Sequence, residues 1–254
     1  MWAQLELLST PVDGYPALIA VAHGSRDPRS AATMAAVVAD IPAVRPDLDV
    51  RLAFLDLNAP SVDQVVDAVA AQGHTHAVVA PLLLGNAFHA RVDLPGLLAA
   101  ARLRHPRLRL TQADVLGPDA RLIAALRDRV LAVDGMDRSV GVAIAAVGSS
   151  SVAANARTAT VARQLTAITG WRTEICFATT EPTLAQAVSR LHDRGAERVL
   201  VAPWFLAPGL LTDRLEAAVP DLAHAHVIGP HPALADIVWD RYDNALTDVL
   251  SLSA

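Results

Sequence analysis

Short apolar runs alternate with longer amphipathic segments along most of the chain. Residues 17–22 and 76–82 are almost wholly apolar, which is typical of strands buried on both faces of a parallel sheet. We expect further strands at 49–55, 107–114, 140–146, 172–178, 197–203 and 224–228. The intervening segments carry apolar residues at helical spacing and predict helices at 28–41, about 58–72, 94–104, 117–131, 151–168, 182–193, 210–218 and 232–250. This alternation predicts right-handed βαβ units and an α/β fold with parallel sheets.

The same alternation starts a second time after residues 133–139, a polar stretch (VDGMDRS) typical of a linker. The segment 71–84 (AQGHTHAVVAPLLL) resembles 193–206 (DRGAERVLVAPWFL). Matching residues recur at one constant offset: Pro60, Gly73 and Pro81 as Pro182, Gly195 and Pro203. We therefore expect two tandem, similar domains, 1–134 and 139–254, that face each other across a cleft, where ligands commonly bind.

Composition narrows the range of functions. The net charge of −5 gives no support for nucleic-acid binding. No apolar run is long enough for a membrane span and residues 1–16 lack the features of a signal peptide, so we expect a cytoplasmic protein. All 21 basic residues are arginine, which excludes Schiff-base chemistry and a P-loop lysine. The single cysteine, Cys176, excludes an internal disulfide or a CxxC metal or cluster motif, and we expect it to be buried.

Three polar side chains of the first half follow its first three predicted strands: His23, Asp56 and His89. The carboxyl ends of parallel strands meet at one edge of a sheet, where open α/β sheets bind ligands. The second half has apolar residues at the matching positions, Val147, Ala178 and Leu211. The fold therefore does not need the polar residues, and we expect chemistry in the first half only. Two imidazoles and a carboxylate suit a divalent metal such as Fe, Co, Ni or Zn, and can accept protons near neutral pH.

Three motifs resemble those of the sirohydrochlorin chelatases: HGSRDP at 23–28, FLD at 54–56 followed by Pro60, and PLLLGNAFHARVDLP at 81–95. The resemblance covers nearly the whole chain. It implies ATP-independent insertion of Fe²⁺ or Co²⁺, with Ni²⁺ as a further candidate, into the tetrapyrrole sirohydrochlorin during siroheme or cobalamin biosynthesis. His23 and His89 would be the catalytic, metal-handling pair, with no nucleotide and no iron–sulfur cluster. The family often has Glu where this chain has the shorter Asp56, which leaves direct metal contact by Asp56 open.

The resemblance also implies further substrate-binding groups and an internal pseudo-dimer within a monomer, because long members of the family have two such halves with one active. Sirohydrochlorin is rich in carboxylates, so we expect Arg26, Arg29 and Arg91 to clamp it, helped by Ser25. Solvated surface arginines are the alternative interpretation. Asp93 is expected to cap the helix at 94–104, and could also orient His89 from the second shell of the site.

Two other functions stay open at this point. One is a tetrapyrrole or metal carrier of the same shape without turnover. The other is a hydrolase that uses Ser25 and His89, although no GxSxG motif supports it. Other histidines are less indicative of a site. His74 and His76 lie beside the start of a predicted strand, and we expect them at the surface. His224 and His226 would share one face of strand 224–228, where they could bind metal.

Overall fold

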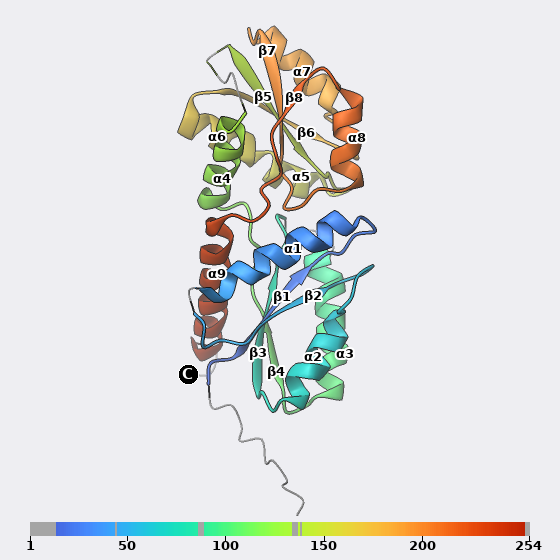
Figure 1. The fold of residues 1–254 in the computed structure, drawn as a ribbon, viewed down its shortest axis with the longest axis vertical. Coiled ribbons are helices and arrows are strands. Elements are labelled where there is room, and N and C mark those ends of the chain that lie inside the picture. Colours follow the sequence, from blue (N-terminus) through green and yellow to red (C-terminus); the bar gives the residue numbers. More distant parts are fainter. Residues whose placement is uncertain (1–13, 44, 86–88, 134–136, 138, 252–254) are drawn as a thin grey trace, which may run out of the picture.

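Two four-stranded parallel sheets form the framework of the protein (Figure 1). The computed structural model describes residues 14–43, 45–85, 89–133, 137 and 139–251, with the backbone alone at 89, 90 and 248–251. The first sheet has the order β2-β1-β3-β4 and comprises β1 (Ala17–Ala22), β2 (Val50–Phe54), β3 (His76–Pro81) and β4 (Arg109–Gln112). The second has the order β6-β5-β7-β8 and comprises β5 (Val140–Ala146), β6 (Arg172–Phe177), β7 (Arg198–Pro203) and β8 (Ala223–His224). The predicted α/β fold with a tandem repeat is confirmed.

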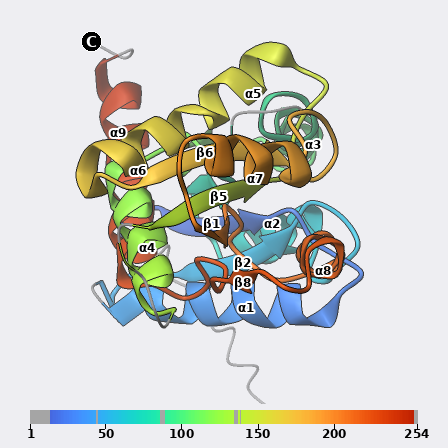
Figure 2. The same ribbon diagram turned by 90° about the horizontal axis from the view of Figure 1, so that it is seen from above.

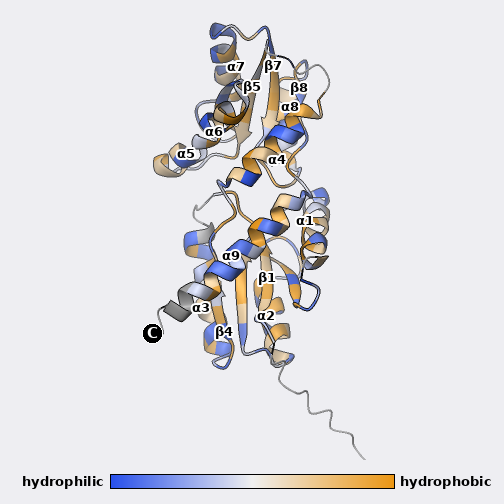
Figure 3. Cartoon of the chain, turned by 90° about the vertical axis from the view of Figure 1, so that its left-hand side faces the viewer, coloured by the Kyte–Doolittle hydropathy of each residue, from blue (hydrophilic) through white to orange (hydrophobic). Residues whose placement is uncertain are grey.

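Helices cover both faces of each sheet (Figures 1 and 2). The first half contributes α1 (Pro28–Asp40), the 3₁₀ turn η1 (Ile41–Ala43), α2 (Val62–Ala71), the π-helical turn η2 (His89–Asp93), α3 (Leu94–Arg104) and α4 (Ala120–Leu131). The second half contributes α5 (Val152–Thr158), α6 (Thr160–Thr169), α7 (Leu184–Asp193), α8 (Leu210–Ala218) and α9 (Pro232–Ser251). Apolar side chains of α2 and α3 fill one face of the first sheet, and those of α7 and α8 the matching face of the second. Figure 3 shows the apolar strands between helices with polar outer faces.

The repeat extends to the way individual helices begin. Ser61 caps α2, and its hydroxyl accepts a hydrogen bond from the backbone N–H of Gln64. The Gln64 side chain accepts one in return from the Ser61 N–H. Thr183 and Gln186 form the same capping box at the start of α7. Each box satisfies two N–H groups that a helix start would otherwise leave unpaired, so the two halves fix the position of equivalent helices by the same local chemistry.

The last helix of each half packs against the other half. Helix α9 packs against α1 and β3 of the first half, whereas α4 packs against α6 and β7 of the second (Figure 1). Trp239 of α9 donates from its indole nitrogen to the carbonyl of Ile41 at 3.1 Å, and the Tyr242 hydroxyl donates to the carbonyl of Pro16 at 2.6 Å. One continuous apolar core consequently runs through both halves. The division of the chain at 134–139 stays a prediction, because the exchanged helices join the two units in space.

Several predicted elements differ from the structure in their extent, and two of these differences have a clear local cause. The helix expected over 151–168 is divided at Ala159 into α5 and α6, where the Thr160 hydroxyl donates to the carbonyl of Arg157 at 2.7 Å and so competes with regular helix geometry. The strand expected over 224–228 ends at His224. Beyond it the N–H of Ile228 bonds instead to the carbonyl of Phe205, past the end of β7, which draws the chain out of the sheet.

Two further expectations concern the buried interior and the membrane. Cys176 is fully buried in β6, as predicted, and burial raises the pKa of its thiol to about 12. Among the helices of the described residues, none combines the length and the apolar character that a membrane crossing requires.

Candidate functional site

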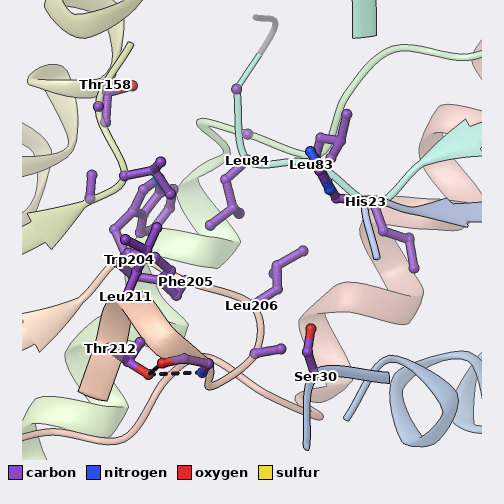
Figure 4. Close-up of a pocket in the computed structure, with 18 of the residues that line it drawn as sticks. His23, Ser30, Leu83, Leu84, Thr158, Trp204, Phe205, Leu206, Leu211 and Thr212 are labelled. Atoms are coloured by element: carbon purple, nitrogen blue, oxygen red, sulfur yellow. Dashed lines mark hydrogen bonds between the residues drawn. The ribbon is translucent and has the colours of Figure 1, made fainter. Parts of the chain in front are cut away.

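A cavity of about 630 Å³ lies between the two halves, at the carboxyl ends of their central strands. The first half lines it with the residues that follow β1 and β3, and the second half with those that follow β5 and β7. Figure 4 shows His23 on one side of this cavity and Trp204, Phe205 and Leu211 on the other. The predicted cleft between the halves is therefore present, and both sheets present to it the edge at which α/β proteins bind ligands.

The loop that carries His23 is tied to the next strand by backbone hydrogen bonds. The N–H of Asp56 donates to the carbonyl of His23 at 3.0 Å, and the N–H of Ser25 donates to the Asn58 side chain at 2.7 Å. Gly24 between them has a φ of +95°, a left-handed conformation that side chains disfavour. Its Cα faces the Asp56 carbonyl so closely that an added Cβ would lie 1.8 Å from that oxygen. The sequence His-Gly-Ser thus holds the histidine at the carboxyl end of β1.

The imidazole of His23 is partly buried and lines the cavity. Its Nδ1 lies 3.2 Å from the Gly24 carbonyl, a distance at which the Nδ1–H tautomer donates a hydrogen bond. In that tautomer Nε2 carries the lone pair, which is the form that can bind a metal or accept a proton.

The carboxylate of Asp56 is near His23 in the fold but not on the cavity wall. Its Oδ1 accepts a hydrogen bond from the N–H of Leu57 at 2.7 Å, and Asp56 is absent from the residues that line the cavity. The backbones of His23 and Asp56 are therefore joined, while of the two side chains only that of His23 lines the cavity. Direct metal binding by Asp56 stays a prediction.

The segment with His89 differs from the expected loop. The backbone of His89 lies in η2, which continues without a break into α3, while the side chain of His89 lies outside the described residues. Asp93, expected to cap the helix, has helical backbone angles and makes no capping hydrogen bond. That expectation is wrong because the helical segment already begins upstream of Asp93. Its second-shell role toward His89 stays a prediction.

The arginines expected to clamp the substrate do not line the cavity. Arg26 and Arg91 are exposed, and neither lies on the cavity wall. Arg29 pairs with Asp27 at 2.5 Å and, across the two halves, with Asp213 of α8 at 2.6 Å. These hydrogen bonds raise the pKa of Arg29, and hydrogen bonding from Arg29 lowers the pKa of Asp27. The geometry makes Arg29 a link between α1 and α8.

Ser25 does line the cavity, as expected of a substrate-binding group. Its hydroxyl accepts a hydrogen bond from the N–H of Asp27 at 3.0 Å, which shapes the turn into α1. A Cβ at Gly209 would lie 3.9 Å from this hydroxyl, so Ser25 directly faces the second half of the chain.

Among the described residues, the second half supplies an apolar wall and one cation to the cavity. Trp204, Phe205 and Leu211 line the side of the cavity opposite His23 (Figure 4), and Leu206 also lines the cavity. The cation is Arg157, near the end of α5, which the sequence reasoning missed. Arg157 is not a polar residue that the second half has lost. Its signal in the sequence is its place in the helix that follows the Gly148-Ser149 loop, the counterpart of Gly24-Ser25.

The remaining histidines lie away from the cavity wall. His74, expected at the surface, is mostly buried and its Nε2 lies 3.1 Å from the Asp49 carboxylate. His76 is half-buried against the Thr111 hydroxyl, and burial lowers its pKa. His224 and His226 do not share a strand face, because β8 ends at His224. Within the described part of the chain, no three His, Cys, Asp or Glu side chains gather as a metal site would require.

A sequence model of the CbiX family matches residues 17–133 and 141–245, which is most of both halves. The chain belongs to the CbiX family. Its match to this family over each half in turn agrees with the repeat in the sequence and with the two sheets of equal topology.

Proteins similar to this CbiX chain include two chelatases of Priestia megaterium. Its sirohydrochlorin ferrochelatase is 28% identical over 254 residues, which cover 94% of each chain. Its sirohydrochlorin cobaltochelatase is 26% identical over 245 residues, 89% of this chain and 78% of the other. The solved structure of SirB from Bacillus subtilis with Fe³⁺ has a TM-score of 0.80 at 25% identity, covering 91% of this chain and 95% of that one. The resemblance to sirohydrochlorin chelatases that the motifs indicated is confirmed.

Proposed function

We propose that this protein inserts a divalent metal ion, Fe²⁺ or Co²⁺, into sirohydrochlorin without using a nucleotide, in the formation of siroheme or cobalamin. The observation that carries the proposal is the position of His23, at the end of β1 on the wall of a cavity between two halves. Relatives that align with this chain over most of its length bear the names of both activities, the ferrochelatase and the cobaltochelatase.

The cavity suits a flat, largely apolar ring. Its volume of about 630 Å³ falls within the range of small-molecule sites in proteins, about 300–1,000 Å³. Trp204, Phe205 and Leu211 offer aromatic and aliphatic surface on the side away from His23 (Figure 4). A tetrapyrrole whose face lies against this surface would turn its other face, and so its central nitrogens, toward the histidine.

The chemistry needs a proton acceptor and weak, open coordination. Two pyrrole nitrogens each lose a proton while a divalent ion takes their place, so charge balances and no electron is transferred. The metal is a substrate, and imidazole is a suitable ligand for Fe²⁺ and Co²⁺ alike. In this proposal His23 and His89 share the tasks of holding the arriving ion and accepting the protons, and Asp56 is a third metal ligand.

The proposal makes the monomer the active form. Residues of both halves line one cavity, so the chain completes its own site without a second copy. The second half offers Val147 and Leu211 where the first has His23 and His89, and it therefore acts as a wall of the site and not as a second catalytic centre.

The test is metal insertion by the purified protein. Sirohydrochlorin is supplied in large excess over protein with Fe²⁺ or Co²⁺ under anaerobic conditions, and product is followed by its absorbance. We expect many products per protein molecule, no dependence on ATP, and a rate well above that of metal and tetrapyrrole alone. Product that stops at one equivalent of protein would instead identify a carrier and contradict the proposal.

Histidine variants connect the activity to the site. His23→Ala and His89→Ala should each abolish insertion and leave the fold intact, because apolar residues stand at both positions in the second half, which folds. His226→Ala is the matched control, since His226 is exposed and does not line the cavity. Full activity in a folded His23→Ala protein would show that the histidine on the cavity wall is not catalytic.

A further inference from the structure

The charges on the cavity wall are unevenly distributed. The chain carries a net charge of −5, yet the described residues that line the cavity include no aspartate or glutamate. They include one arginine, Arg157. The net negative charge of the protein would repel a carboxylate-rich ligand, whereas Arg157 offers that ligand a positive charge on the cavity wall.

We propose that Arg157 binds a peripheral carboxylate of the tetrapyrrole, so that the second half selects the substrate while the first half handles the metal. This inference rests on the proposed function. It adds to it a substrate-binding residue in the half that lacks the histidines.

The guanidinium of Arg157 is available to bind a ligand. Arg29 of α1 is already paired with Asp27 and with Asp213. Within the described part of the chain, by contrast, no hydrogen bond or ion pair holds the side chain of Arg157, which is exposed. A planar guanidinium with its donors unoccupied is suited to bidentate binding of a carboxylate.

Hydrogen bonds hold the backbone around Arg157 in place. The Thr160 hydroxyl donates to the Arg157 carbonyl at 2.7 Å, at the break between α5 and α6. The neighbouring polar groups on the cavity wall are satisfied within the protein: the Asn155 amide bonds to both the N–H and the carbonyl of Ser149, and the Thr158 hydroxyl donates to Ala154. Among the described groups here, Arg157 is thus the one whose side-chain donors are left for a ligand.

Arg157 lies on the opposite half of the chain from His23. Thr158, the next residue along α5, lies on the second-half side of the cavity, across from His23 (Figure 4). A ring that lies on Trp204 and Phe205 with its centre toward His23 has its edge, where the carboxylates are, near this end of α5. Arg157 would therefore fix the orientation of the ring without touching the reacting nitrogens.

A purely structural role is the competing explanation, because an arginine in the last turn of a helix also interacts favourably with the helix dipole. That role would affect stability and leave substrate binding unchanged. The two explanations are separated by measuring binding of metal-free sirohydrochlorin by absorbance titration, together with KM and kcat for insertion.

The variants are Arg157→Gln, Arg157→Lys and the control Arg163→Gln, which removes an equal charge from an exposed position on α6 outside the cavity. We expect Arg157→Gln to raise Kd and KM about tenfold with kcat changed less than twofold, as for loss of one charge-assisted hydrogen-bonded pair. Arg157→Lys should recover part of the affinity. A fully esterified tetrapyrrole, which has no free carboxylate, should bind the wild type and Arg157→Gln equally.

Two outcomes would overturn the inference. One is equal affinity of Arg157→Gln and Arg163→Gln for sirohydrochlorin. The other is a loss of affinity in Arg157→Gln that is as large for the esterified tetrapyrrole as for sirohydrochlorin. Wild-type protein that binds sirohydrochlorin without repeated turnover would contradict the proposed function alone, since the titration still measures the contribution of Arg157. Wild-type protein that binds no tetrapyrrole would contradict both.

Discussion

Replacing Gly24 by alanine should damage the His23 loop more than an equivalent change elsewhere in the chain. Gly24, Gly148 and Gly73 all have left-handed φ angles, of +95°, +93° and +87°. Alanine in this conformation costs about 1–2 kcal/mol by itself. The three sites differ in what the new Cβ meets: nothing within 4 Å at Gly73, the Thr179 side-chain hydroxyl at 2.8 Å at Gly148, and the Asp56 backbone carbonyl oxygen at 1.8 Å at Gly24.

The contact at Gly24 sets the magnitude. The Asp56 carbonyl can move away only if the loops separate, which breaks the bond from Asp56 N–H to His23 and the bond from Ser25 N–H to Asn58. Each such bond contributes about 1 kcal/mol. We therefore expect Gly24→Ala to lower the free energy of unfolding by about 3–4 kcal/mol, against about 1–2 for Gly73→Ala, with Gly148→Ala between them.

The assay is equilibrium unfolding in urea at one temperature for all three variants, with the slope of the transition checked for two-state behaviour. Insertion activity is then measured under conditions where each variant is folded. Gly24→Ala should lose activity, because the loop that positions His23 has moved, while Gly73→Ala should not. Equal destabilisation by Gly24→Ala and Gly73→Ala would refute the reasoning, since it would show that the close approach to Asp56 carries no energetic weight.

Three other predictions concern stability. The hydrogen bond from Arg121 lowers the pKa of Asp119, so the ionised carboxylate stabilises the fold above its unfolded pKa, and this stabilisation is lost as pH falls through the lower folded pKa. Asp119→Asn should therefore lower the free energy of unfolding by about 1 kcal/mol at pH 7 and make stability fall less steeply at acid pH. An unchanged acid dependence of stability would contradict this prediction. Tyr242→Phe removes the donor to a backbone carbonyl and should cost about 1 kcal/mol in urea unfolding, whereas Tyr15→Phe, at an exposed position, should cost nothing measurable. Ser61→Ala should lower the free energy of unfolding by about 1 kcal/mol through loss of the α2 cap, whereas Ser61→Asn, which can also cap a helix, should retain most of the stability. An equal loss of stability in both variants would argue against capping.

Local patterns in the sequence predicted most of the fold and part of the site. Wholly apolar runs such as 17–22 and 140–146 indicated central strands because such strands are buried on both faces. The position of His23 followed from the same logic, since a residue just after a parallel strand must lie at the carboxyl edge of its sheet. Prolines and glycines recur in the second half at a constant offset from those of the first, which indicated the repeat and therefore the cleft between the halves.

What the sequence did not predict depends on contacts between distant residues. The pairing of Arg29 with Asp213 joins two halves through positions that no local pattern relates. The place of Arg157 on the cavity wall depends on the break at Ala159 and on how the two halves face each other. Asp93 failed as a cap because a π-helical turn, for which periodicity gives no signal, precedes it.

The exchange of α4 and α9 bears on how such a chain can evolve. In a homodimer built around a central cavity, each substitution changes both walls at once, so neither wall can specialise alone. In a chain of two similar halves the walls accumulate substitutions independently, and here one retains His23 while the other carries Val147 at the same place. The exchanged helices keep such divergent copies together, because their shared core would be exposed if the halves separated. Selection could therefore alter one wall of the cavity while the scaffold of both halves stayed the same.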